Sequence, residues 1–362
     1  MTFEEARAQF PVLERIAYLN AGSMGPVARA TADAIAEQVA SELEHGRGGK
    51  PYVERMLALR ADVRARIASL LGVEVERVAL TSSTTDGCNV VLAGLELGLE
   101  DEVVTTDSEH PGLLAPLHAS GARVVVAPTS TRPAADALDV LCAAVTKRTK
   151  LFALSHVCWT TGHVIPVHEL RRETGLPVLV DGAQSVGAIP VEIGALDWYT
   201  VSAQKWLCGP EPLGALYVAD PERLRVALPT YFSLQRIEQD GSFEPKPGAP
   251  RFDSGWLAVP SLAGLLAALD CAPDWRFDRA AEIAARCREM LAAAGYDVVT
   301  EPGQATLVAF RPRDGEPAAD AAARAYAAGV VIRDLPATGW LRASCGWWTN
   351  EDDLDRLVAA LA

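Results

Sequence analysis

The spacing of hydrophobic and polar residues changes twice along the chain. From residue 27 nearly to 72, Ala, Leu and Val recur at helical spacing among Glu and Arg, with a break at HGRGGKP. This spacing predicts two helices, because clustered glycine and proline interrupt a helical pattern. Short runs rich in β-branched residues follow, separated mostly by helical or loop segments. They predict strands at 78–80, 102–105, 123–127, 150–154, 178–180, 198–201 and 215–218.

The alternation of strands and helices is typical of a mostly parallel sheet covered on both faces. From about Pro260 the pattern changes to alanine-rich helices, short strands near 305–310, 329–332 and 340–343, and a final helix at 351–361. We therefore expect an α/β fold, with a large domain built on a mostly parallel seven-stranded sheet and a smaller α+β domain. Segment 229–254 is rich in Pro, Gly and aromatic residues, and its length favours a functional loop.

Composition narrows the choice of partner and compartment. The chain has 362 residues, 49% of them hydrophobic and 22% charged, which is typical of a globular protein large enough for two domains. Its formal charge of -14 disfavours nucleic acid and anionic membranes as partners. The seven cysteines include no C-x-x-C pair, and the N-terminus lacks the basic and apolar segments of a signal peptide. We expect a cytoplasmic protein that binds a small molecule and no metal.

Two candidate sites follow predicted strands, at the sheet edge where such folds bind ligands. In LTSSTTDGCN a strand ends at Leu80 and a helix begins near Thr85, so free N–H groups and the positive helix end lie beside hydroxyl groups. This is either a phosphate site or an ordinary Ser/Thr helix cap. In VLVDGAQSVG, Asp181 closes an apolar strand and Gln184 follows it. The acid is either a turn former or the partner of a cation.

The third candidate is Lys205, the one charge in VSAQKWLCGP, with Ser202 three residues before it. Its ammonium group could reach solvent along its aliphatic stem, or desolvation could make it a nucleophilic amine. A phosphate site, an acid and a lysine together match the phosphate, ring nitrogen and aldehyde of pyridoxal 5'-phosphate (PLP). His110, in SEHPG after another strand, could stack on such a ring, although a lone histidine there is more often a structural hydrogen bonder.

In these motifs the sequence resembles the class V aminotransferase and cysteine desulfurase family of fold-type I PLP-dependent enzymes, including isopenicillin-N epimerase-like and selenocysteine lyase-like members. The resemblance covers nearly the whole chain. Its motifs, in order, are YLNAGSMGPV, TSSTTDG, SEHPG, SHVCWTTGHVIPV, VDGAQSVG, SAQKWLCGPEPLGALYV, RFDSG and LRASCG. It implies a large PLP-binding domain at 15–255, a small domain made of 1–14 and 256–362, and a homodimer with its active site at the two-fold interface.

The resemblance also implies residue roles. Lys205 would form the internal aldimine and move protons, Asp181 would hold the pyridine nitrogen, and His110 would stack on the ring. Other cofactor contacts would come from Thr84, Thr85, Gln184, Ser202 and Gln204, and, across the dimer interface, from Ser254, Gly255 and Trp256. The substrate would be bound by Asn20, Ala21, Trp159 and Arg342. The planar guanidinium of Arg342 suits a carboxylate.

Four positions depart from the desulfurase pattern. Gln204 replaces the histidine before the lysine, and it can donate to a phosphate but cannot titrate. Trp159 replaces an asparagine, as in isopenicillin-N epimerase-like sequences, and would reshape the substrate pocket. Trp256 replaces a threonine that reaches the neighbouring phosphate, which leaves that role to Ser254 and the Gly255 backbone. No cysteine precedes Arg342 in its short loop, and we expect Cys345 to pack in the small domain.

The sequence therefore predicts a PLP-dependent lyase or transferase acting on a small amino acid or one with a sulfur-bearing side chain. Loss of a β-substituent would make it a C–S lyase without a persulfide cysteine, and we rank this reaction first. Reprotonation at the cofactor would make it an aminotransferase, and reprotonation at Cα an epimerase. A nicotinamide-dependent reductase is disfavoured because no G-x-G-x-x-G follows an early strand. A binding-only module is disfavoured because it would need no aldimine lysine.

Overall fold

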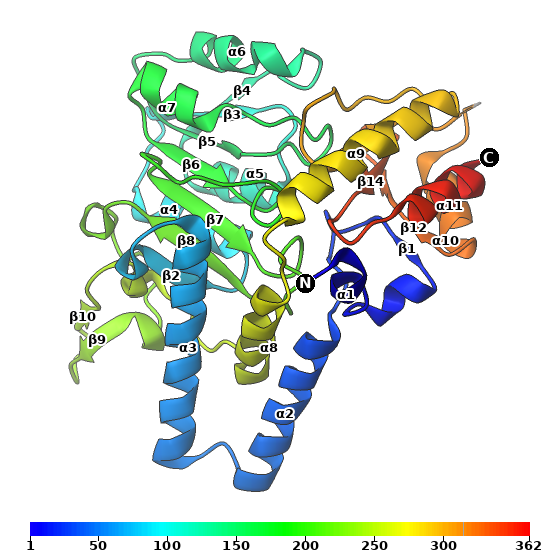
Figure 1. Ribbon diagram of the computed structural model, residues 1–362. Coiled ribbons are helices and arrows are strands. Elements are labelled where there is room, and N and C mark those ends of the chain that lie inside the picture. Colours follow the sequence, from blue (N-terminus) through cyan, green and yellow to red (C-terminus); the bar gives the residue numbers. More distant parts are fainter. Residues whose placement is uncertain (314) are drawn as a thin grey trace.

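The computed structural model describes residues 1–313 and 315–362, and its largest element is a seven-stranded sheet of order β2-β8-β7-β6-β5-β3-β4 (Figure 1). Neighbouring strands are parallel except at β8, which is antiparallel to both β2 and β7. The strands are β2 (Val78–Thr81), β3 (Glu102–Thr106), β4 (Arg123–Ala127), β5 (Thr149–Ser155), β6 (Val178–Asp181), β7 (Trp198–Ser202) and β8 (Gly214–Val218). All seven predicted strands are present, each within one residue of its predicted ends.

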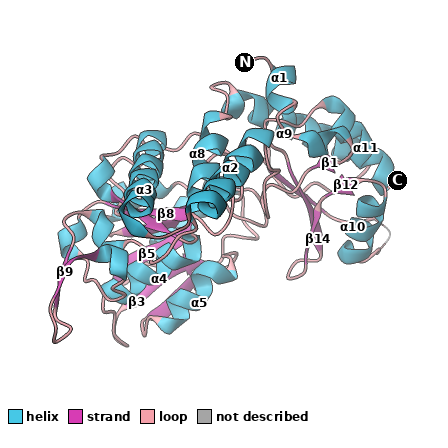
Figure 2. Ribbon diagram, turned by 90° about the horizontal axis from the view of Figure 1, so that it is seen from below, coloured by secondary structure: helices cyan, strands magenta, loops and turns pink. Residues whose placement is uncertain are grey.

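Helices cover both faces of this sheet, which confirms the predicted α/β architecture (Figure 2). Alternate strand residues point to opposite faces. Leu80 and Val180, for example, pack with one set of helices, and Ala79 and Leu179 with the other. The first set is α3 (Gly49–Leu71), α6 (Ala137–Ala143), α7 (Val167–Thr174) and α8 (Val259–Asp270), and the second is α4 (Thr84–Gly94) and α5 (Pro111–Ala119).

The two helices predicted before the sheet are α2 (Arg29–His45) and α3, which form a long hairpin (Figure 1). The break lies at the predicted HGRGGKP segment, where Gly46 has a φ of 76° that favours glycine. Helix α8 packs closely on α2, because a Cβ on Gly264 would lie 2.7 Å from Ile35 Cγ1. No helix within 1–313 or 315–362 combines the length and apolar character needed to cross a membrane.

The C-terminal part of the chain forms a second, smaller layer. A three-stranded antiparallel sheet has the order β11-β14-β13, with β11 (Leu307–Phe310), β13 (Arg333–Leu335) and β14 (Trp340–Ser344). Its core is shared with α9 (Arg276–Ala293), α10 (Ala318–Ala327) and α11 (Glu351–Leu361). The predicted strands near 305–310, 329–332 and 340–343 and the final helix are confirmed. Strand β13 is absent from the prediction, because three residues are too few to show alternation.

Other short elements link the two layers. Strand β1 (Ala17–Tyr18) lies in the segment assigned to the large domain, yet it pairs with β12 (Val330–Val331) of the small layer. Helix α8, assigned to the small domain, packs on α2 and α3. The predicted boundaries of the large domain, residues 15 and 255, stay a prediction. If the domains were drawn by these contacts, strand β1 would belong to the small layer and helix α8 to the large one. The remaining α-helix is α1 (Phe3–Arg7), and the remaining strands, β9 (Leu234–Ile237) and β10 (Phe243–Pro245), form a hairpin within loop 229–254.

Candidate active site

A cavity of about 230 Å³ lies beside the carboxyl ends of β2, β3, β6 and β7 and the face of the smaller sheet. Nine residues that the sequence predicts for the site line it. They are Thr84, Thr85, His110, Trp159, Gln184, Ser202, Gln204, Lys205 and Arg342. Gly22, Ser23, Ser83 and Arg333 complete the wall. The cavity thus brings together residues from segments far apart in the sequence.

The N-terminus of α4 forms the hydroxyl-rich end of the cavity. Ser83, not a threonine, is the helix cap, because its Oγ accepts the Asp86 N–H at 3.1 Å. Thr84 and Thr85 follow in the first turn, and within the part of the chain that the structure describes their N–H groups have no protein acceptor. Free donors at the positive end of an 11-residue helix suit a phosphate group.

Lys205 lies in the turn after β7, and burial lowers its pKa to about 8. The negative charge of Asp181 opposes this shift, whereas the positive charge of Arg342 adds to it. An amine with this pKa is partly neutral near neutral pH and available as a nucleophile. The backbone of this turn is held closely, because Gly25 N–H donates to Gln204 O at 2.7 Å. A Cβ on Gly25 would lie 2.1 Å from Lys205 O, so the position requires glycine.

Asp181 ends β6 and His110 lies in the loop after β3, at the same edge of the sheet. Asp181 is buried, and its Oδ1 accepts the Ala183 N–H at 2.9 Å, so it forms the turn and still carries charge near Lys205. His110 Nδ1 accepts the Gly112 N–H at 3.0 Å, which leaves the proton of the neutral ring on Nε2. Burial and the charge of Lys205 lower the pKa of His110. The ring therefore stays uncharged and can lie against another aromatic ring.

Two glutamines that line the cavity, Gln184 and Gln204, are held in place by hydrogen bonds. Gln184 Nε2 donates to Gly22 O at 2.8 Å, and its Oε1 accepts the Trp206 indole N–H at 2.9 Å. These bonds fix the amide and leave its second N–H for a ligand. Ser202 Oγ donates to Gln204 Oε1 at 2.9 Å, so these two side chains form one polar group next to Lys205.

Two arginines form the side of the cavity that the smaller sheet provides. Arg333 and Arg342 are directly opposite each other on β13 and β14. Arg342 is fully buried and donates to Trp159 O at 2.8 Å, while Arg333 donates to Ser23 Oγ at 2.9 Å. Within residues 1–313 and 315–362 neither arginine has a carboxylate partner, and Arg342 Nε makes no hydrogen bond. Unpaired guanidinium groups facing a cavity suit a carboxylate ligand.

Sequence reasoning missed Arg333, Ser83, Ser23 and Gly22. One signal could have found Arg333: two arginines nine residues apart flank the turn residues PATG, and a hairpin brings such positions face to face. The predicted substrate residues Asn20 and Ala21 lie next to the cavity, but its wall is formed by the two residues that follow them. Their roles stay predictions.

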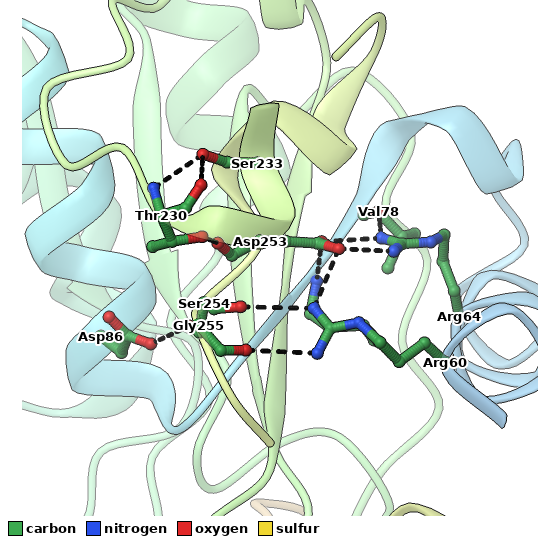
Figure 3. A network of polar contacts seen from close by, with 10 residues as sticks. Arg60, Arg64, Val78, Asp86, Thr230, Ser233, Asp253, Ser254 and Gly255 are labelled. Atoms are coloured by element: carbon green, nitrogen blue, oxygen red, sulfur yellow. Dashed lines mark hydrogen bonds and ion pairs between the residues drawn. The ribbon is translucent and has the colours of Figure 1, made fainter. Parts of the chain in front are cut away.

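The segment predicted to serve a neighbouring subunit does not line this cavity. Ser254 Oγ donates to Asp86 in the first turn of α4, and Arg60 donates to Gly255 O at 3.3 Å (Figure 3). Trp256 is 70% exposed and stacks on Tyr231. Ser254 is therefore held against the first turn of helix α4, while the Trp256 side chain faces outward. Its predicted contact with a second cofactor stays a prediction.

Asp253, which directly precedes this segment, anchors it to α3 and β2 (Figure 3). Its carboxylate accepts hydrogen bonds from Arg64 at 2.7 and 3.0 Å, from Arg60 at 3.1 Å and from the Leu80 N–H at 2.9 Å. All of these groups are buried. The network connects α3, β2 and the segment that follows Asp253, and thereby the first turn of α4.

Cys345 packs in the core of the smaller layer, as predicted. It is fully buried, and its contact with Cys287 together with burial raises the pKa of its thiol. A thiol in this state is a poor nucleophile. Of the described residues that line the cavity, none is a cysteine.

This fold and this site define a PLP-dependent enzyme: a half-buried lysine, a buried acid and a helix N-terminus fit the aldehyde, ring nitrogen and phosphate of the cofactor. The aminotransferase class-V family matches residues 18–357, and the chain belongs to that family. Its relatives carry out different reactions. Isopenicillin N epimerase of Streptomyces clavuligerus is 28% identical over 99% of this chain and 97% of the epimerase.

Other relatives are named for sulfur chemistry. A probable cysteine desulfurase of Xylella fastidiosa is 29% identical over 82% of this chain and 78% of its own length. Among solved structures, the cystine C-S lyase C-DES, in complex with its product cysteine persulfide, has a TM-score of 0.91 and 28% identity, covering 98% of this chain and 99% of the lyase. Another C-DES structure contains glycine covalently linked to PLP.

Proposed function

We propose that the protein binds PLP on Lys205 and cleaves a C–S bond of an α-amino acid by β-elimination, without a persulfide cysteine. The observation that carries this proposal is one cavity whose described lining residues include a lysine of lowered pKa and the unpaired Arg333 and Arg342, but no cysteine. The similarity to a cystine C-S lyase over nearly the whole chain supports the choice of reaction.

Each residue then has a defined task. The helix N-terminus at Thr84 and Thr85 would hold the cofactor phosphate, and Asp181 would hold the ring nitrogen. Bound PLP withdraws the electrons left behind when Cα loses its proton. Arg342 would bind the substrate carboxylate and so fix Cα near Lys205. The Lys205 amine, freed when the substrate amine takes its place on the cofactor, would remove the Cα proton, which would leave with the departing sulfur group.

Two other reactions would use the same residues up to the removal of the Cα proton. Amino transfer to a keto acid is our second candidate. Epimerisation is the third, and the epimerase relative and Trp159 support it. The reaction types differ in their products, so product analysis separates them.

The experiment incubates the purified, PLP-loaded protein with a panel of amino acids and measures sulfide, pyruvate, ammonia, keto acids and Cα inversion together. We expect pyruvate and ammonia from substrates with a sulfur leaving group, and no products from Lys205→Ala. Cys345→Ser is the matched control and should retain activity. Keto-acid-dependent amino transfer without elimination would contradict the proposed reaction.

We also propose that the protein is a cytoplasmic homodimer. Tyr231, Ile237 and Trp256 are 77%, 63% and 70% exposed around one groove, which is more apolar surface than a monomer usually shows on a loop. A second copy covering this groove would place segment 254–256 at the shared interface. The seven cysteines are all free, as is usual in a reducing compartment.

A further inference from the structure

A second cavity adjoins the first along the same segments of chain. The β3–α5 loop contributes His110 to the inner cavity and Glu109 to the outer one. The β13–β14 hairpin contributes Arg333 to the inner cavity and Trp340 to the outer one, and Trp159 lines both. The two cavities therefore adjoin at Trp159, whose backbone oxygen accepts a hydrogen bond from Arg342, the proposed carboxylate ligand.

The volumes decide what each cavity can hold. The inner cavity measures about 230 Å³, which is below the roughly 300–1,000 Å³ of ordinary ligand pockets. It must take both the cofactor and the α-amino-acid end of the substrate. The outer cavity measures about 770 Å³. Because Trp159 lines both cavities, a substrate side chain too long for the inner cavity would be directed towards the outer one.

The charges of the outer cavity have both signs. Arg132 makes no ion pair with any residue that the structure describes. Glu301 lies close by, because its Oε1 accepts the N–H of Ala134 at 3.0 Å, while its Oε2 makes no hydrogen bond within the same residues. By contrast, Asp107 is occupied by Thr129 and Ser130, which donate at 3.0 and 2.8 Å from their backbones.

The other charged groups of the outer cavity are also engaged. Glu109 accepts hydrogen bonds from Ser155 and Thr106, and Arg311 pairs with Asp297 at 2.6 Å. His163 Nε2 lies 3.7 Å from Glu301 Oε1, beyond hydrogen-bond distance, and has no hydrogen-bond partner among residues 1–313 and 315–362. The Arg132 guanidinium and Glu301 Oε2 therefore remain for a ligand, as do the ring nitrogens Trp159 Nε1 and His163 Nε2, which have no hydrogen-bond partner within the described residues. Trp159 and Trp340 provide aromatic walls.

We propose that the outer cavity is a subsite for the far end of a two-ended substrate, an α-amino acid whose side chain ends in a second amino-acid group. Arg132 would bind the distal carboxylate, Glu301 the distal ammonium, and the aromatic walls the linker between the two ends. This inference rests on the proposed function, because Lys205 and Arg342 are taken to fix the near end.

The test measures binding rather than turnover, so it does not depend on the reaction type. Titration calorimetry of the PLP-loaded protein compares 2,6-diaminopimelate, which has two amino-acid ends and no leaving group, with one-ended 2-aminoheptanoate. Partly exposed ion pairs strengthen binding modestly, so we expect a Kd about three- to ten-fold lower for diaminopimelate. The absorption spectrum of the cofactor, followed in the same titration, reports whether the near end has reached PLP.

Variants separate the two distal contacts. Arg132→Ala should raise the Kd of 2-aminoadipate, which has only the distal carboxylate, and leave that of lysine unchanged. Glu301→Gln, which keeps the acceptor for Ala134, should do the reverse. Arg47→Ala, on the distant α2–α3 turn, is the matched control.

Equal Kd values for diaminopimelate and 2-aminoheptanoate, or an Arg132→Ala variant that binds 2-aminoadipate normally, would overturn the subsite. Failure of the proposed function looks different, because neither ligand would then change the cofactor spectrum.

Discussion

Removing the carboxylate of Asp253 tests how the segment beside α4 is held. In Asp253→Ala, Arg60 and Arg64, which are 4% and 9% exposed, lose their common partner, and the Leu80 N–H loses its acceptor. Breaking a buried ion pair costs about 3–5 kcal/mol, because a buried charge is left without compensation. An unpaired buried N–H costs about 1–3 kcal/mol. The cost of the broken ion pair and that of the unpaired N–H overlap, because both come from loss of the same carboxylate. We expect the free energy of unfolding to fall by about 4 kcal/mol.

The assay is urea unfolding followed by tryptophan fluorescence and circular dichroism, at one fixed protein concentration. Since domains have stabilities of about 5–15 kcal/mol, a loss of this size moves the midpoint far outside experimental error. Asp220→Ala is the control, because it breaks the exposed pair of Asp220 with Arg223 and should cost about 0.5 kcal/mol or less. A loss below about 1 kcal/mol in Asp253→Ala would refute the reasoning.

Three further predictions follow from the site and the surface. Asp181→Ala should retain some cofactor and lose about one to two decades in kcat, because a charge-assisted pair contributes about 1.5–3 kcal/mol; near wild-type turnover would assign Asp181 to its turn alone. Burial raises the pKa of Glu109 to about 7 from a reference of 4.5, so its contribution to stability is complete below pH 4.5 and is lost as pH rises to about 7. Glu109→Gln should therefore be less stable relative to wild type at pH 4.5 than at pH 7.5, and an equal difference at both would contradict this. Light scattering should give about twice the chain mass of 38.5 kDa, and Gly255→Glu should lower both the dimer fraction and cofactor affinity; a monomer with cofactor fully bound would exclude the shared interface.

The hydrophobic pattern predicts the large sheet closely, for a physical reason. Strands such as β6, buried on both faces, appear as continuous apolar runs bounded by turn residues. Lys205 and Asp181 stand out because each is a charge at the end of such a run. Their positions can be inferred without the structure, since parallel strands bring their carboxyl ends to one edge.

Contacts between distant segments are not predictable in this way. Arg60 and Arg64 are one turn apart on a helix and look like an ordinary solvated face, yet both turn inward to Asp253, 193 and 189 residues away. Arg333 lies on a strand too short to show alternation. In both cases the partner is set by tertiary packing, which leaves no periodic signal in the sequence.

The central claim is that PLP is attached to Lys205. Borohydride reduction of the loaded protein, followed by proteolysis and mass spectrometry, locates the attachment directly. Lys246 is the internal comparison, because burial also lowers its pKa although it lies outside the cavity. We expect the phosphopyridoxyl group on the peptide that contains Lys205, and its loss in Lys205→Ala but not in Lys246→Ala. A label on another lysine, or none on the loaded wild-type protein, would contradict the account.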